Sequence, residues 1–329
     1  MKQTITSPTM EKNRAFYQNY IAPMLKQEFP EYENHIAVGV VGEGSDCFGY
    51  DDLISQDHDF GIGVCLWLTE EDAQAIGPQL QAEYQKQLEL WYRTNVTESA
   101  FLSPQELRIR LMIRRGVQTT SQFYTGLLGF KLQSTEPLIS NASWFYTEEW
   151  RFATATNGVV FRDDLGEFSR IRQTLLSHYP DRIFRMRLAN ALHEFSGAMQ
   201  ANYARCMSRG DLVAANFCKS RSIEAAMDIL FLLNHRFAPY YKWKFKAFTE
   251  LPNSADISNL LTAASMELPS LEAWKDVDYD ARRVNTQDPL VNTFEKIASL
   301  IANQLYDAGL TRSKEVFLEA HCQDIGNGI

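Results

Sequence analysis

The chain has 329 residues, of which 45% are hydrophobic and 22% charged, a normal balance for a globular protein of about two domains. Its net charge of −9 argues against a broad nucleic-acid surface, which needs clustered Lys and Arg, but leaves room for a local basic pocket. Five cysteines without a CxxC pair predict neither a disulfide framework nor a zinc ribbon. The N-terminal residues contain no apolar signal segment, and the apolar run ILFLL at 229–233 is too short to span a membrane. We therefore expect a cytoplasmic protein without a membrane partner.

The first half of the sequence predicts a mixture of helices and strands. Residues 10–28 form one amphipathic pattern, and 35–42 (HIAVGVVG) is apolar on both faces, as in a central buried strand. A second strand is predicted at 57–68 and a third at 157–164, which begins with an Asn-Gly turn signal. Between them, a helix is expected at 69–93, with Pro78 interrupting or kinking it early, and residues 103–155 look helical and aromatic.

The second half predicts helices only. The segment 181–207 places apolar residues at steps of three and four, which indicates a long amphipathic helix. Further helices are expected at about 211–235, 240–249, 255–266 and 287–308. The predicted fold class is α+β: a mixed sheet with helices in residues 1–170, followed by an all-α helical bundle in residues 171–329. The boundary is expected within 165–180.

Five aspartates are concentrated in VGEGSDCFGYDDLISQDHDFGIG, residues 41–63. If 57–68 is a strand, Asp57 and Asp59 project from one face, with Cα atoms about 7 Å apart. Two carboxylates at that spacing repel each other unless a cation lies between them, and hard oxygen ligands favour Mg²⁺ or Mn²⁺. His58 points to the other face, where a packed histidine is expected. Asp51 and Asp52 are expected in the connecting loop, and Asp46 fits either a metal site or a helix start.

Gly44 and Ser45 follow the first predicted strand directly. A strand–turn–helix with glycine in the turn presents backbone N–H groups to an anion, and the Ser45 hydroxyl adds a donor. A phosphate-binding turn beside metal-binding carboxylates is what phosphoryl or nucleotidyl transfer requires. The Rossmann, Walker A, nucleophile-elbow and EF-hand patterns all fail at this segment.

These residues resemble the nucleotidyltransferase superfamily with a DNA polymerase beta-like fold, in which G[GS] precedes [DE]-h-[DE] after a short spacer. Here Gly44-Ser45 is followed by residues 46–56 and then Asp57-His58-Asp59. The string GSDCFGYDDLISQDHDFG is similar to a bacterial branch known only as a domain of unknown function, with a C-terminal helical domain like that of the antibiotic nucleotidyltransferases. His58 departs from the aliphatic residue usual at the middle position.

The resemblance implies a third carboxylate on a later strand, and Asp163 is favoured over Asp164 because it lies three residues before Gly166. A strand-end turn or a helix cap is the alternative for this pair. The resemblance also implies that Lys242, in APYYKW, reaches the nucleotide phosphates; a lysine stem covering packed aromatics is the alternative. Three charged residues of the second half fit either the predicted interdomain cleft or a solvated helix end: Arg205, Arg209 and Asp211.

The predicted function is transfer of a nucleoside monophosphate from an NTP, with ATP favoured, to a hydroxyl group. The acceptor is a small molecule or a macromolecule, with a small molecule slightly favoured and nucleic acid not excluded. Asp57, Asp59 and Asp163 are the predicted catalytic and metal-binding residues, whereas Gly44, Ser45 and Lys242 are predicted to bind the nucleotide. The alternatives are a non-catalytic nucleotide-binding regulatory module and an enzyme that modifies RNA ends or protein hydroxyls.

Overall fold

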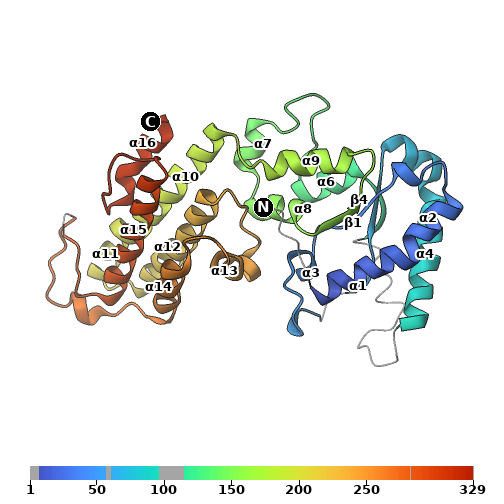
Figure 1. Ribbon diagram of the computed structural model, residues 1–329. Helices are drawn as coiled ribbons and strands as arrows, with labels where there is room; N and C mark the ends of the chain where they lie inside the picture. The colour runs from blue at the N-terminus through green and yellow to red at the C-terminus, as the bar shows by residue number, and fades with distance from the viewer. Residues whose placement is uncertain (1–6, 57–60, 96–114, 282, 329) are drawn as a thin grey trace. The chain divides into compact units, whose positions relative to one another are not determined.

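A computed structural model gives the fold (Figure 1) and describes residues 7–56, 61–95, 115–281 and 283–328. The chain divides into two compact units, Met1–Ser177 and His178–Ile329. The first unit combines a small sheet with helices, and every regular element of the second unit among the described residues is a helix. The protein is therefore α+β, as the sequence predicts.

The sheet of the first unit has four described strands in the order β3–β2–β1–β4. They are β1 (Ala37–Val40), β2 (Cys65–Leu68), β3 (Gly116–Thr119) and β4 (Val159–Arg162). β1 runs antiparallel to both β2 and β4, whereas β3 is parallel to β2. The end of β1 therefore meets the starts of the other three strands. We call this the exit end of the sheet, and it is marked by Val40, Cys65, Gly116 and Val159.

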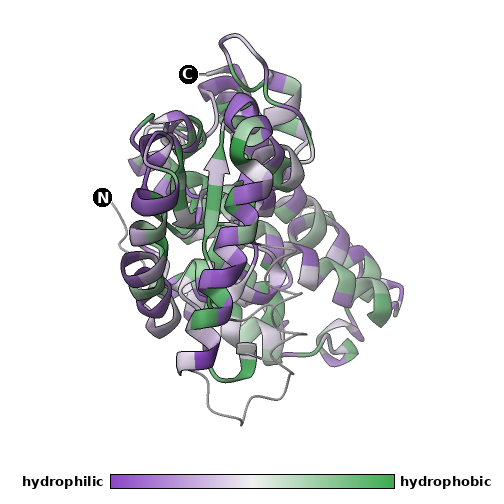
Figure 2. Ribbon diagram, turned by 90° about the vertical axis from the view of Figure 1, so that its right-hand side faces the viewer, coloured by the Kyte–Doolittle hydropathy of each residue, from purple (hydrophilic) through white to green (hydrophobic). Residues whose placement is uncertain are grey.

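Helices cover both faces of this sheet. Every residue of the central strands β1 and β2 is therefore buried. On one face, Val38, Val40, Leu66 and Leu68 belong to an apolar cluster with residues of α1 (Pro8–Phe16), α2 (Ala22–Glu28) and α4 (Glu70–Asn95). On the other face, the Trp67 ring stacks on Phe168 of α9 (Glu167–Leu176), with centroids 3.8 Å apart, and contacts Phe123 of α6 (Thr120–Leu128). Figure 2 shows hydrophobic residues along the strands and hydrophilic residues on the outer sides of helices.

The remaining helical elements of the first unit are short. They are a π-helical turn joining α1 to α2 (Tyr17–Ile21), α3 (Ser45–Phe48), α7 (Asn141–Tyr146), α8 (Glu149–Thr156) and 3-10 turns at Glu33–His35 and Ile54–Gln56. Most local predictions for this half are confirmed: the opening helix, the strand within 35–42 and the strand within 157–164.

Three local predictions for this half need correction. The second strand begins only at Cys65, and residues 61–64 precede it in irregular conformation. The segment 103–155 contains the strand β3, which is only four residues long, with two buried ends and two partly buried middle residues, and gives no readable alternation. Pro78 does not end its helix, since α4 continues to Asn95. The hydrogen bond that Pro78 cannot donate is offset because α4 buries Leu80, Tyr84 and Leu88.

The second unit follows its predicted helices closely. The long helix within 181–207 is observed as α10 (Asp181–Phe195), a π-helical segment (Ser196–Asn202) and α11 (Tyr203–Ser208). The others are α12 (Leu212–Leu233), α13 (Tyr241–Thr249), α14 (Ala255–Met266), α15 (Pro289–Asp307), α16 (Cys322–Asn327) and 3-10 turns at Leu271–Trp274 and Leu318–His321. Their inward faces bury Leu188, Phe195 and Phe294 completely. Among the residues that the structure describes, no helix combines the length and apolarity needed to cross a bilayer.

Candidate functional site

The turn that leaves β1 carries two of the three residues predicted to bind the nucleotide phosphates, Gly44 and Ser45. Gly42 and Gly44 adopt φ angles of 117° and 114°, which L side chains rarely allow. Gly44 caps α3, and Ser45 is the first residue of that helix. Because α3 has only four residues, its dipole is small, and an anion here would depend on individual N–H groups and on the Ser45 hydroxyl.

Asn157 holds the start of this turn against the beginning of β4. The Gly42 N–H donates to Asn157 Oδ1 at 2.8 Å, and Asn157 Nδ2 donates to the Gly42 carbonyl at 2.7 Å. The next residue, Gly158, donates its N–H to the Cys47 carbonyl at 2.8 Å. A Cβ atom on Gly158 would lie 1.9 Å from the Val40 carbonyl oxygen, so only glycine fits. The Asn-Gly pair therefore does more than form a turn, because its hydrogen bonds to Gly42 and Cys47 fix the β1 turn against the start of β4.

A buried ion pair between Asp46 and Arg115 lies beside the same turn. Both side chains are only 1% exposed, and Arg115 Nη2 bonds to Asp46 Oδ2. Arg115 Nη1 donates to the carbonyls of Gly61 and Gly63 at 2.9 and 3.1 Å. Burial by itself would lower the pKa of Arg115, but the surrounding groups, the Asp46 carboxylate first among them, together raise it above its usual value. The guanidinium therefore stays charged and joins the β1 turn to the chain that enters β2.

The predicted metal ligands Asp57 and Asp59, together with His58, lie outside the described residues. The described chain on either side of them is held at defined points. Before them, the Ser55 N–H donates to Asp52 Oδ1 at 2.8 Å, and after them Arg115 binds the Gly61 carbonyl. Asp51 accepts from the Thr9 N–H of α1 at 3.0 Å, and both Asp51 and Asp52 lie in the loop between α3 and the 3-10 turn at Ile54–Gln56, as expected.

Asp163 lies at the opposite end of the sheet from Gly44 and Ser45. In the antiparallel register Val40 faces Val159, whereas Val38 faces Arg162, the residue before Asp163. The four residues of β4 separate Asp163 from the exit end by roughly 13 Å along the strand. The strand register therefore places Asp163 away from the Gly44 turn, and its role as a third carboxylate stays a prediction.

The contacts of Asp163 fit the helix-cap alternative instead. Its Oδ1 accepts from the Gly166 N–H at 3.0 Å and its Oδ2 from the Ser169 N–H at 2.6 Å, at the start of α9. Asp164 forms an ion pair with Arg162 at 2.6 Å. An aspartate at the end of an apolar strand has the same sequence pattern in either role, and only the strand direction distinguishes them.

The described residues contain no group of three or more His, Cys, Asp or Glu side chains arranged to hold a metal ion. The prediction of a metal site therefore depends on Asp57 and Asp59. Sequence reasoning missed Arg115 and the bonding role of Asn157. The Asn-Gly signal at 157–158 could have drawn attention to Asn157, but no local pattern marks Arg115.

Lys242 lies on α13 in the second unit. Its Nζ atom is 5.2 Å from the centroid of the Trp243 ring, and Trp243 is 7% exposed. The contact of Lys242 with nucleotide phosphates stays a prediction. The other candidate residues of this half form a helix end, as one sequence alternative holds: Gly210 adopts a φ of 72°, and Asp211 caps α12 by accepting from the Ala214 N–H.

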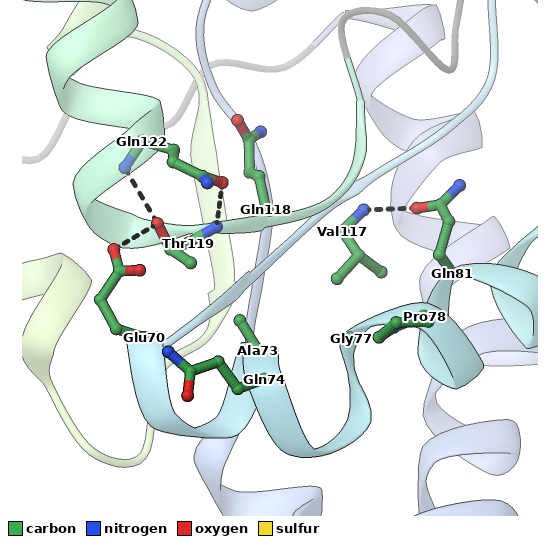
Figure 3. A pocket seen from close by; sticks show the side chains of 10 residues that line it. All are labelled: Glu70, Ala73, Gln74, Gly77, Pro78, Gln81, Val117, Gln118, Thr119 and Gln122. Carbon is green, nitrogen blue, oxygen red and sulfur yellow. Dashed lines mark hydrogen bonds between the residues drawn. The ribbon is translucent and has the colours of Figure 1, made fainter.

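A separate polar pocket of about 290 Å³ lies against the outer side of β3 (Figure 3). Residues of α4, β3 and α6 line it, and it includes none of the predicted site residues. Gln81 Oε1 accepts from the Val117 N–H at 2.8 Å, and Gln122 Oε1 accepts from the Thr119 N–H at 3.2 Å. The two glutamines therefore cover the outward N–H groups of this edge strand, which would otherwise be open to another strand.

Comparison with known proteins gives one family match. The model of a family described as Domain of unknown function (DUF4037) matches residues 144–244. The match includes Asp163 and Lys242, and it ends before the second half of α13. It does not extend to Gly44, Ser45 or the predicted metal ligands. A search of curated proteins returned no match to the chain.

Proposed function

We propose that the exit end of the sheet is the active site of a metal-dependent nucleotidyltransferase. One observation carries the proposal: Arg115 and Asp46 tie the Gly44–Ser45 turn to Gly61, which follows Asp59 by two residues. The antiparallel pairing of β1 with β2 supports it, since the exit of one strand and the approach to the other meet at one end of the sheet. A phosphate-binding turn beside two carboxylates is the arrangement that the reaction needs.

Each residue has a defined part in the proposed reaction. Ser45 and the backbone N–H groups of the turn bind the β- and γ-phosphates of the NTP, with ATP favoured. Asp57 and Asp59 would hold Mg²⁺ or Mn²⁺, which when bound would supply positive charge against the phosphates and the leaving pyrophosphate. An acceptor hydroxyl attacks the α-phosphorus and gives up its proton to solvent; the new O–P bond forms as the bond to pyrophosphate breaks. Asp163 is left out of the proposal because of its place at the other end of β4, and Lys242 is not needed for it.

The placement of Asp163 favours a second candidate function as well. Without a third carboxylate, the same turn can bind nucleotide without activating an acceptor. A non-catalytic nucleotide-binding regulatory module is therefore the alternative. It predicts ATP binding that is insensitive to Asp59→Asn, with no release of pyrophosphate.

The decisive experiment measures ATP binding by calorimetry with and without Mg²⁺, together with transfer of label from α-labelled ATP in a cell extract. Asp57→Asn should weaken Mg²⁺-dependent binding by more than about 100-fold, since metal ligands matter at least as much as their supporting residues. Asp163→Asn is the matched control, because asparagine keeps one of the two capping oxygens and should retain both ATP binding and label transfer.

Three outcomes separate the possibilities. Mg²⁺-dependent binding and label transfer that both disappear in Asp57→Asn support the enzyme. Binding that persists in Asp59→Asn without pyrophosphate release favours the regulatory module. A folded protein that binds no ATP at millimolar concentration excludes both.

A further inference from the structure

The exposed face of α13 combines two aromatic side chains with two lysines. Tyr241 and Phe245 are 90% and 39% exposed, and Lys242 and Lys246 are exposed beside them. The spacing i, i+1, i+4 and i+5 places all four on one side of the helix. We call these four residues the α13 face. Exposed aromatic rings of this size need a reason, because removing them from water is favourable.

Both lysine ammonium groups of the α13 face are positioned by one indole ring. Lys242 Nζ lies 5.2 Å and Lys246 Nζ 5.8 Å from the centroid of Trp243, a distance typical of cation–π contacts. Trp243 itself is 7% exposed, so it provides a fixed base for both charges. The α13 face therefore presents two positive charges at restricted positions.

The third lysine of this helix has a different role. Lys244 lies on the buried side, where its Nζ is 2.7 Å from Asp228 Oδ1 and 3.1 Å from Glu224 Oε1. Those two carboxylates neutralise Lys244 within the helical unit. The alternation in YKWKFK thus places Lys244 on the buried side of the helix and Lys242 and Lys246 on its exposed side.

The two exposed aromatic rings are supported in the same way. Tyr241 makes an edge contact with Tyr240, and Phe245 stacks on the fully buried Phe248, with centroids 6.1 Å apart. One helical turn, about 6 Å, separates the two exposed residues along the axis. A base could stack on each ring while the neighbouring lysine contacts its phosphate, because every base has a π-face.

We propose that the α13 face binds single-stranded nucleic acid through base stacking on Tyr241 and Phe245 and phosphate contacts from Lys242 and Lys246. The charge and the exposed rings together favour this ligand over an anionic membrane. A helix that lies on a membrane separates its apolar side from its cationic side, whereas here aromatic and cationic residues alternate on one face. Because the net charge of the chain is −9, we expect binding to be confined to this face, with the modest salt dependence that two phosphate contacts give.

The test uses the full chain and a fluorescent 12-nucleotide oligoadenylate RNA, with anisotropy measured over a series of salt concentrations. Two lysine–phosphate contacts predict a slope of about −1.4 in log K against log salt, and Lys242→Ala should reduce it to about −0.7. Tyr241→Ala should weaken binding about tenfold, because it removes one stacking platform. The anisotropy titration contains neither Mg²⁺ nor ATP. The RNA-binding proposal can therefore hold even if the proposed nucleotidyl transfer fails.

A matched control exists in the same unit. Lys314 Nζ lies 4.7 Å from the ring of Tyr306, which is 45% exposed, and the double variant Tyr306→Ala/Lys314→Ala should bind RNA like the wild type. The proposal is overturned if the wild type does not bind the RNA at low salt or if the control loses binding as much as Tyr241→Ala. It is also overturned if anionic vesicles bind in place of RNA. Weakened ATP binding in Lys242→Ala with unchanged RNA binding would instead assign this lysine to the nucleotide.

Discussion

The exit end of the sheet and the core of the helical unit are stabilised by different kinds of contact. At the exit end, buried polar side chains hold irregular backbone: Asn157 binds Gly42, Arg115 binds Gly61, and Asn13 Oδ1 accepts from the Gly63 N–H at 2.9 Å. In the helical unit, fully buried apolar residues such as Leu188 and Phe294 fill the space between helices.

The difference follows from where the backbone finds its hydrogen bonds. A helix satisfies the hydrogen bonds of its own N–H and C=O groups. The side chains packed between helices can therefore be apolar, and one apolar residue can replace another of similar volume at a small cost in stability. The backbone groups of a buried turn lack such partners within the turn. Polar side chains must therefore supply each hydrogen bond, and each must point in a fixed direction. We therefore expect the exit end to tolerate substitution less well than the helical core, which the following experiments can test.

The largest effect is expected for Arg115→Met. Removing the guanidinium leaves the Asp46 carboxylate buried without a partner, which should destabilise the protein by about 4 kcal/mol. Urea denaturation followed by circular dichroism measures the change. Asp46→Leu/Arg115→Met should recover part of the loss, because it removes the unpaired charge. Arg170→Met is the control, since its ion pair with Glu136 is exposed, and it should change stability by less than about 0.5 kcal/mol.

In the helical core, Leu188→Ala should cost about 3 kcal/mol, because it leaves a cavity among buried side chains of α10 and its neighbours. The comparison is sharpened by Leu188→Met, which keeps the volume of the side chain and should cost less than about 1.5 kcal/mol.

Arg115→Lys keeps the charge but loses the fork of donors that reaches both Asp46 and Gly61. If Arg115→Lys is tolerated as well as Leu188→Met in urea denaturation, the proposed contrast between the two regions is incorrect.

A smaller loss of about 2 kcal/mol is expected for Asn157→Ala, because both polar groups of Gly42 lose their partner. The same variant should weaken ATP binding in calorimetry, since it loosens the turn that carries Gly44 and Ser45. Asn216→Ala is a suitable control. Its side chain only bonds to the Leu212 carbonyl of the same exposed helix turn, and neither stability nor ATP binding should change.

The smallest effect near neutral pH concerns His178 of the helical unit. Burial lowers the pKa of His178 to about 3, and the nearby His235 adds to the depression. In the unfolded chain the histidine binds a proton near pH 6.5, so proton uptake favours unfolding as the pH falls between those two values. The contribution of neutral His178 to the free energy of unfolding is fully present well above pH 6.5. By about pH 5.5 it should have fallen by about 1.4 kcal/mol.

Urea denaturation at several pH values measures this dependence. His178→Asn should remove this part of the slope, and asparagine tolerates the φ of 69° found at this position. His193→Asn, at a ring that is 61% exposed, should leave the His178 contribution unchanged. An unaltered slope in His178→Asn would show that other groups cause the acid sensitivity.

The sequence predicted regular elements well where periodicity extends over many residues. The helices of the second unit and the buried strand β1 are such cases, because burial imposes a pattern that can be read locally. β3 was missed because a strand of four residues, buried at both ends and partly buried between them, carries too little pattern. Pro78 was expected to disturb its helix, but the apolar face of α4 outweighs one missing hydrogen bond.

For the candidate site, the sequence by itself determined the residue types and their order: a glycine-serine turn after a buried strand, followed by paired carboxylates. Only the tertiary structure decided which groups meet. The strand directions place Arg115 and Asn157 beside the turn and Asp163 at the far end of β4. Strand direction depends on contacts between residues distant in sequence, such as Asp46 with Arg115, and no local pattern records those contacts.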